Sequence, residues 1–240
     1  MSRSLRPDKV LQTIELLRIR IEERFPGAGL GEVVRELGEN GHKTQREVTR
    51  LARPSVAIRL LVALVLAGVV GLICGIPLLI SNMGLEHDPP TFGDVINILE
   101  PALGATFFLT AFVVFLTSIE RSRKRSRVLS ALYEYRAMAH VIDMHQLTKD
   151  PQSHFERIPT EHSPERDMTP FELSRYFDYC SEALALISKV ASLYAERFPD
   201  QVVTTAVDEI EGLTSRLSQK VWQKTMLISA AAASPPTTGP

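Results

Sequence analysis

The sequence has little cysteine and almost no net charge, and each shortage excludes a class of protein. Its two cysteines give no disulfide framework, because Cys74 lies in an apolar run and Cys180 in a helical pattern. A formal net charge of −1 argues against a protein that binds nucleic acid through a basic domain. The sequence has no Cys/His metal-ligand spacing, and the glycines at 27, 29 and 31 follow a helical pattern instead of the strand that a dinucleotide site requires. We therefore expect no cofactor and no nucleic-acid partner.

Charge is also missing from two long runs. Residues 60–80 contain no charged side chain, and most of them are Leu, Ile or Val. A helix needs about 20 such residues to cross a bilayer core. A second apolar run, residues 101–119, is bounded by Glu100-Pro101, which is a helix-start signal, and by Glu120. The two runs predict a hairpin of two transmembrane helices within residues 55–120, joined by a short external loop.

Lysine and arginine are absent between the two runs and frequent on their outer flanks. Residues 81–97 contain neither, whereas residues 43–59 contain five. A basic cluster follows the second run and consists of Arg121, Arg123, Lys124, Arg125 and Arg127. The positive-inside rule then places both termini in the cytosol. We also expect the basic cluster to contact anionic lipid headgroups, which makes the bilayer itself a partner.

Small residues recur every four positions along one face of the first run: Ala63, Ala67, Gly71 and Gly75. Such a ladder lets helices approach closely in lipid. Two interpretations stay open at this point. The ladder packs against Gly104, Ala105 and Ala111 of the second run, or it forms a seam between copies of the chain.

Helical periodicity dominates the rest of the chain. Residues 1–54 predict a helical hairpin with a stop at Pro26-Gly27, and residues 121–150 a juxtamembrane basic helix. Residues 151–169 predict a loop, residues 170–228 a second helical hairpin, and residues 229–240 a disordered tail. The second hairpin has a capping-box start in Thr169, Pro170 and Glu172.

A weak internal repeat links the two hairpins. The tetrapeptide Glu-Arg-Phe-Pro occurs at residues 23–26 and 196–199, and each copy ends a helical pattern. The offset that aligns the two copies also pairs Ile14 with Ile187 and Leu37 with Ile210. We therefore predict an all-α fold in which both hairpins pack together as one cytosolic helical bundle.

One cluster, His140, Asp143 and His145, suggests chemistry. On a helix His140 and Asp143 share a face, but His145 lies about 140° away from His140 at 100° per residue. The three side chains therefore do not converge on one metal ion from a regular helix. Two further histidines, His154 and His162, lie in the following loop and could complete a site. Cys180 lies on an apolar stripe, which indicates an inert core thiol.

Two stretches resemble a group of bacterial membrane proteins that have two spans, helical cytosolic ends and no assigned activity. These stretches are residues 137–151 (AMAHVIDMHQLTKDP) and residues 169–223, which contain TPFELSRYFDYCSE and AVDEIEGLTSRLSQKVWQ. The resemblance implies a location in the bacterial inner membrane. It implies no catalytic residues.

These patterns favour a non-enzymatic interaction or regulatory protein, anchored in the membrane, with a protein partner or a homo-oligomeric assembly. Two alternatives stay open. One is a hydrolytic or metal-dependent membrane enzyme that uses His140, Asp143 and His145. The other is a small oligomeric channel or transport component built on the small-residue face.

Overall fold

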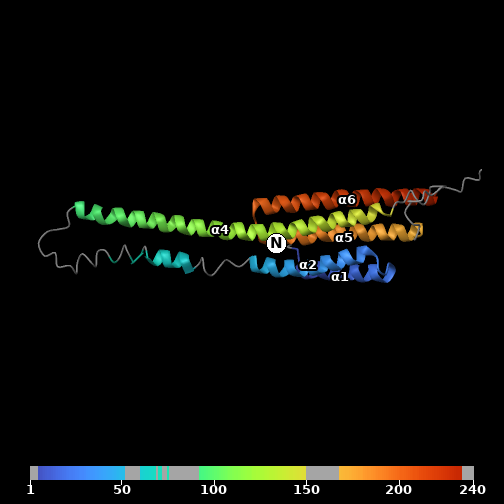
Figure 1. The fold of residues 1–240 in the computed structure, drawn as a ribbon, viewed down its shortest axis with the longest axis horizontal. Helices are drawn as coiled ribbons and strands as arrows, with labels where there is room; N and C mark the ends of the chain where they lie inside the picture. Colours follow the sequence, from blue (N-terminus) through green and yellow to red (C-terminus); the bar gives the residue numbers. More distant parts are fainter. Residues whose placement is uncertain are drawn as a thin grey trace, which may run out of the picture. The chain divides into compact units, whose positions relative to one another are not determined.

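The structure is a computed structural model that describes residues 5–51, 60–68, 70, 71, 75, 92–149 and 168–233. Its helices are α1 (Pro7–Arg24), α2 (Gly29–Leu51), α4 (Phe92–Leu147), α5 (Pro170–Arg197) and α6 (Gln201–Ala233) (Figure 1). Residues 60–68, 70, 71 and 75 are helical as well. The described residues contain no strand, so the all-α prediction is confirmed for them.

The chain divides into two compact units, and α4 contributes to both. One unit comprises Met1–Ala52 and Arg125–Pro240, and the other comprises Arg53–Lys124. We call the first unit the helical bundle; it contains α1, α2, α5, α6 and the part of α4 from Arg125 onward. Most of the predicted loop at 151–169 and the end of the tail lie outside the described residues. The tail was expected from residue 229, but α6 runs to Ala233, because a run of alanines is a strong helix former.

One described helix is long and apolar enough to cross a membrane. It is the stretch Leu103–Leu147 of α4, whose most apolar window has a mean hydropathy of 1.8 with none of that window buried. Phe107 and Phe108, for example, are 70% and 74% exposed. The first apolar run lies partly outside the described residues, so the two-span hairpin stays a prediction.

The prediction that Pro101 begins the second apolar helix is wrong. The helix α4 begins at Phe92 and carries Pro101 in its interior. A proline at that position removes one backbone hydrogen bond and crowds the preceding turn, which disfavours it in a helix interior. The apolar residues at 95, 96, 98 and 99 nevertheless continue a helical pattern upstream of the proline. Residues 92–97 of the expected link, residues 81–97, therefore belong to α4.

The predicted start of the second hairpin is confirmed. The backbone N–H of Glu172 donates to Thr169 Oγ1 at 3.2 Å, and the backbone N–H of Thr169 donates to Glu172 Oε2 at 2.8 Å. Pro170 occupies the first turn, where its missing N–H costs nothing. This reciprocal capping box holds the beginning of α5.

The two Glu-Arg-Phe-Pro segments end their helices in nearly the same conformation. Phe25 has φ −131° and ψ 65°, and its N–H donates to the carbonyl of Ile21. Phe198 has φ −129° and ψ 81°, and its N–H donates to the carbonyl of Tyr194. The sequence repeat is therefore also a repeat of backbone geometry.

The buried positions of the two hairpins also correspond when the two tetrapeptides are aligned. In α1 and α5 the corresponding buried residues are Leu11 and Leu184, Ile14 and Ile187, Leu17 and Val190, and Ile21 and Tyr194. In α2 and α6 they are Leu30 and Val203, Val34 and Val207, Leu37 and Ile210, and Val48 and Val221. The first hairpin is thus repeated as the second, with the same face turned inward.

Helices α1 and α5 pack in antiparallel register. The N–H of Leu5 donates to Glu196 Oε1 at 3.0 Å, and Arg20 pairs with Glu182 at 2.5 Å. This register brings Ile14 of α1 opposite its counterpart Ile187 of α5. Residues of α4, including Tyr135, belong to the same buried core, so the two hairpins and α4 share one core.

Candidate functional site

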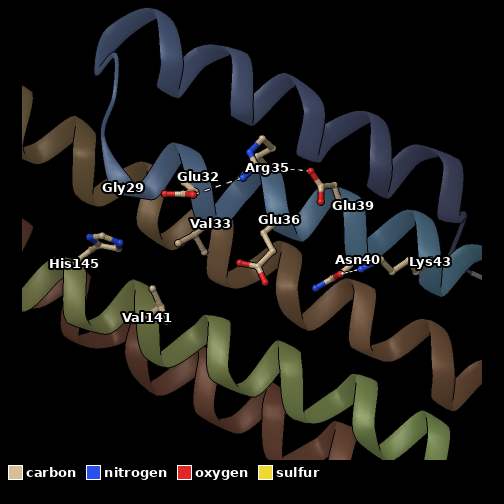
Figure 2. Close-up of a pocket in the computed structure, with 10 residues that line it drawn as sticks. All are labelled: Gly29, Glu32, Val33, Arg35, Glu36, Glu39, Asn40, Lys43, Val141 and His145. Atoms are coloured by element: carbon tan, nitrogen blue, oxygen red, sulfur yellow. Dashed lines mark hydrogen bonds and ion pairs between the residues drawn. The ribbon is translucent and has the colours of Figure 1, made fainter.

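A groove runs along the helical bundle between α2 and α4 (Figure 2). It consists of two adjoining pockets of about 510 and 260 Å³, which share Asn40 and Lys43. The larger pocket is lined only by residues of α2 and α4. The smaller pocket reaches Tyr194 of α5.

Two close approaches bracket the larger pocket. At one end, a Cβ added to Gly29 of α2 would lie 2.4 Å from His145 Cε1 of α4, so the glycine permits this contact. Beyond the other end, Thr44 of α2 and Tyr135 of α4 are joined by a hydrogen bond of 2.5 Å. Between these two contacts the helices leave an opening.

The α2 side of the groove carries alternating charges that are only partly paired. Arg35 pairs with Glu32 at 3.7 Å and with Glu39 at 2.6 Å. Lys43 Nζ donates to Asn40 Oδ1 at 2.8 Å. Glu36 points from α2 toward α4 and has no ion pair with any described residue (Figure 2).

A chain of hydroxyl groups connects three helices beneath the smaller pocket. Tyr194 OH donates to Glu47 Oε2 at 2.7 Å, and Thr44 Oγ1 donates to Tyr194 OH at 3.2 Å. A threonine hydroxyl has one proton, so Tyr135 OH must be the donor in its hydrogen bond to Thr44. Thr44, Tyr135 and Tyr194 are each 1% exposed. These hydrogen bonds therefore give the three buried hydroxyl groups partners, without which their burial would be costly.

Tyr135 and Tyr194, the two tyrosines in this series of hydrogen-bonded hydroxyl groups, act as hydrogen-bond donors and not as bases. Burial raises the pKa of Tyr135 well above its ordinary value, and the hydrogen bond with Thr44 opposes this only in part. Burial likewise raises the pKa of Tyr194, and the nearby Glu47 adds to the increase. Both phenols stay protonated at physiological pH, which suits a structural connection better than proton abstraction.

Of His140, Asp143 and His145, only His145 lines the groove. His145 lines the groove against Gly29, His140 is exposed and Asp143 is partly buried, and neither of the last two lines a groove pocket. In the part of the chain that the structure describes, no group of three or more His, Cys, Asp or Glu side chains is placed to hold a metal ion. His154 and His162 lie outside that part. Cys180 is buried as expected, and burial raises the pKa of its thiol.

Two members of the basic cluster have acidic neighbours in the structure. Arg125 Nη2 donates to Asp200 Oδ2 at 2.7 Å, and the Asp200 side chain is only 1% exposed. Lys124 pairs with Glu120 at 2.8 Å. Contact of Arg121, Arg123, Lys124, Arg125 and Arg127 with lipid headgroups stays a prediction.

The small-residue ladder shows no close helix contact among the described residues. A Cβ added to Gly71, Gly75 or Gly104 would meet no atom within 4 Å. Packing of Ala63, Ala67, Gly71 and Gly75 against the second apolar run therefore stays a prediction, as does a seam between copies.

The Thr44→Val substitution tests the structural role of the hydroxyl chain. Valine has nearly the same shape but leaves Tyr135 without its acceptor and Tyr194 without a donor. We expect the free energy of unfolding to fall by about 1–3 kcal/mol, measured by urea unfolding in detergent. Thr205→Val on the exposed side of α6 is the matched control. Equal effects of the two substitutions would contradict the assigned role.

Comparisons with family models, with curated proteins and with solved structures find no match to this chain. The resemblance to two-span bacterial membrane proteins therefore stays an expectation.

Proposed function

We propose that this chain is a membrane-anchored, non-enzymatic interaction or regulatory protein. In this proposal, helices at about residues 60–80 and 101–119 cross the bacterial inner membrane, and both termini lie in the cytosol. The helical bundle is presented there to a protein partner, which is either another protein or a further copy of this chain. The apolar helix α4 and the basic residues that flank both runs support this arrangement.

The groove between α2 and α4 is the observation that carries the proposal. The bundle has a continuous buried core, yet α2 and α4 leave a groove open between them. Of its lining side chains, Arg35 and Glu39 are joined in an ion pair and Glu47 accepts a hydrogen bond from Tyr194, which fits a surface for recognition better than a site for chemistry. His140 and Asp143 line neither pocket of the groove, which also favours binding over catalysis at the groove.

The experiment that tests this function is cross-linking in native membranes followed by purification of the full-length chain. Val141→Lys changes a groove residue that is 43% exposed, and Leu16→Lys changes an α1 residue that is 54% exposed outside the groove. We expect a protein to co-purify in a constant ratio with the wild type and with Leu16→Lys, and to be lost with Val141→Lys.

Two results would contradict the proposal. The first is the absence of any protein at a constant ratio, including additional copies of the chain. The second is a phenotype that disappears in His140→Ala and Asp143→Ala while complex formation is unchanged, because that result would favour the enzyme.

A further inference from the structure

The internal repeat indicates that Glu36 of α2 lacks the arginine partner that its counterpart in α6 has. Aligning the two Glu-Arg-Phe-Pro segments maps Glu36 of α2 onto Glu209 of α6. Glu209 pairs with Arg136 of α4 at 3.4 Å. On the α6 side of the bundle, an arginine from a neighbouring helix therefore neutralises this glutamate. On the α2 side no described residue does so, although Glu36 points into the groove (Figure 2).

The remaining charges of the groove give it an acidic character. Its two pockets are lined by five carboxylates and three cationic side chains, the latter being Arg35, Lys43 and Arg127. Arg35 is already occupied by two glutamates, and Lys43 is bonded to Asn40. Glu134 lines the α4 side and forms no ion pair with the described residues. An incoming cation therefore meets carboxylates on both walls.

The groove also has the size and the apolar contacts for a peptide segment. From Gly29 to Glu47 it follows about 27 Å of α2 at 1.5 Å per residue. Val141 of α4 is 43% exposed and offers apolar surface to the occupant, whereas Val33 of α2 lines the pocket but is only 6% exposed. Such a mixture of acidic and apolar positions suits an amphipathic basic segment.

We propose that the groove between α2 and α4 binds an arginine-bearing segment of a partner protein. An arginine of the partner pairs with Glu36 as Arg136 pairs with Glu209 in the repeated hairpin. This inference rests on the proposed function and names the chemistry of the partner. Planar guanidinium groups are well suited to paired contacts with carboxylates, so arginine is favoured over lysine.

The test measures binding of a defined peptide to the full-length chain in a zwitterionic detergent. The probe is a fluorescein-labelled alanine-leucine helical peptide with arginines on one face. Its control is the same peptide with citrulline in place of arginine, which keeps the shape and removes the charge. The protein variants are Glu36→Gln with Glu134→Gln in the groove, and Asp208→Asn, an exposed α6 residue outside it. Fluorescence anisotropy gives the dissociation constants.

We expect the arginine peptide to bind, and the citrulline peptide to bind at least about tenfold more weakly. The groove variant should weaken binding of the arginine peptide by a similar factor, whereas Asp208→Asn should leave it unchanged. Circular dichroism checks that both variants are folded.

Failure to bind the arginine peptide, equal binding of both peptides, or equal effects of the groove and control variants would overturn the inference. The proposed function would survive these results if Val141→Lys still removed a co-purifying protein, so the two failures are distinguishable.

Discussion

Replacing Ile187 with alanine is expected to lower the free energy of unfolding of the helical bundle by about 2–5 kcal/mol. Ile187 is completely buried in α5, and the register of α1 and α5 places it opposite its repeat counterpart Ile14. The substitution removes apolar burial and leaves a cavity at the contact between the two hairpins. Guanidinium unfolding of the detergent-solubilised chain, followed by circular dichroism, measures the change.

The matched control is Leu16→Ala in α1, a side chain that is 54% exposed. Its substitution should change the free energy of unfolding by no more than about 0.5 kcal/mol. The effects of Ile14→Ala and Ile187→Ala should not be additive, because the two side chains lie opposite each other in one core and their cavities would be coupled. Additive losses, or an Ile187→Ala effect as small as the control, would mean that the hairpins do not share one core.

Replacing Asp200 with alanine is the second change with a large expected effect, about 2–3 kcal/mol of lost stability from the helix cap and the charged hydrogen bond together. The side chain of Asp200 accepts a hydrogen bond from the N–H of Val202 at 3.1 Å, which caps α6. It also accepts from Arg125 at 2.7 Å, and the alanine variant would leave this arginine without its carboxylate. The same unfolding measurement applies, with Asp208→Ala on the exposed side of α6 as the control.

The pH dependence of the free energy of unfolding provides an independent check of the ion pair between Arg125 and Asp200. The hydrogen bond from Arg125 lowers the pKa of Asp200 below its ordinary value. The folded-state pKa is then lower than the unfolded-state pKa, so the stabilisation is complete above pH of about 4 and is lost as the pH falls through the lowered value. Acidification in that range should destabilise the wild type more than Asp200→Ala. Identical acid profiles would show that the pair adds no stability.

The sequence predicted the local features of the fold because their signals are local. The capping box at Thr169 and the helix stops at Phe25 and Phe198 depend on a few neighbouring residues, and the structure has all three. The internal repeat was detectable in the sequence because each hairpin needs one apolar face, and the apolar positions of the two hairpins match when the Glu-Arg-Phe-Pro segments are aligned. The predicted helix start at Pro101 was wrong because proline is favoured at helix starts, whereas here the apolar pattern and α4 both extend upstream of it.

The candidate site was not predicted, because it depends on contacts between segments far apart in the sequence. Thr44 lies on the same apolar face of α2 as Leu37 and Val48, so a polar residue in that stripe was the available signal. Its partners Tyr135 and Tyr194 are recognisable only once α4 and α5 are in place. The ion pair of Arg125 with the buried Asp200 was not predicted either, because the two residues lie 75 positions apart in the sequence.

Cysteine labelling in spheroplasts tests the central claim of a bundle anchored on the cytosolic side by two spans. In a Cys74→Ser background, one variant carries Gly84→Cys between the apolar runs and another carries Ser215→Cys on the exposed face of α6. A membrane-impermeant maleimide should label Gly84→Cys in intact spheroplasts and Ser215→Cys only after permeabilisation. Labelling of Ser215→Cys before permeabilisation, or recovery of the chain in the soluble fraction without detergent, would contradict the account.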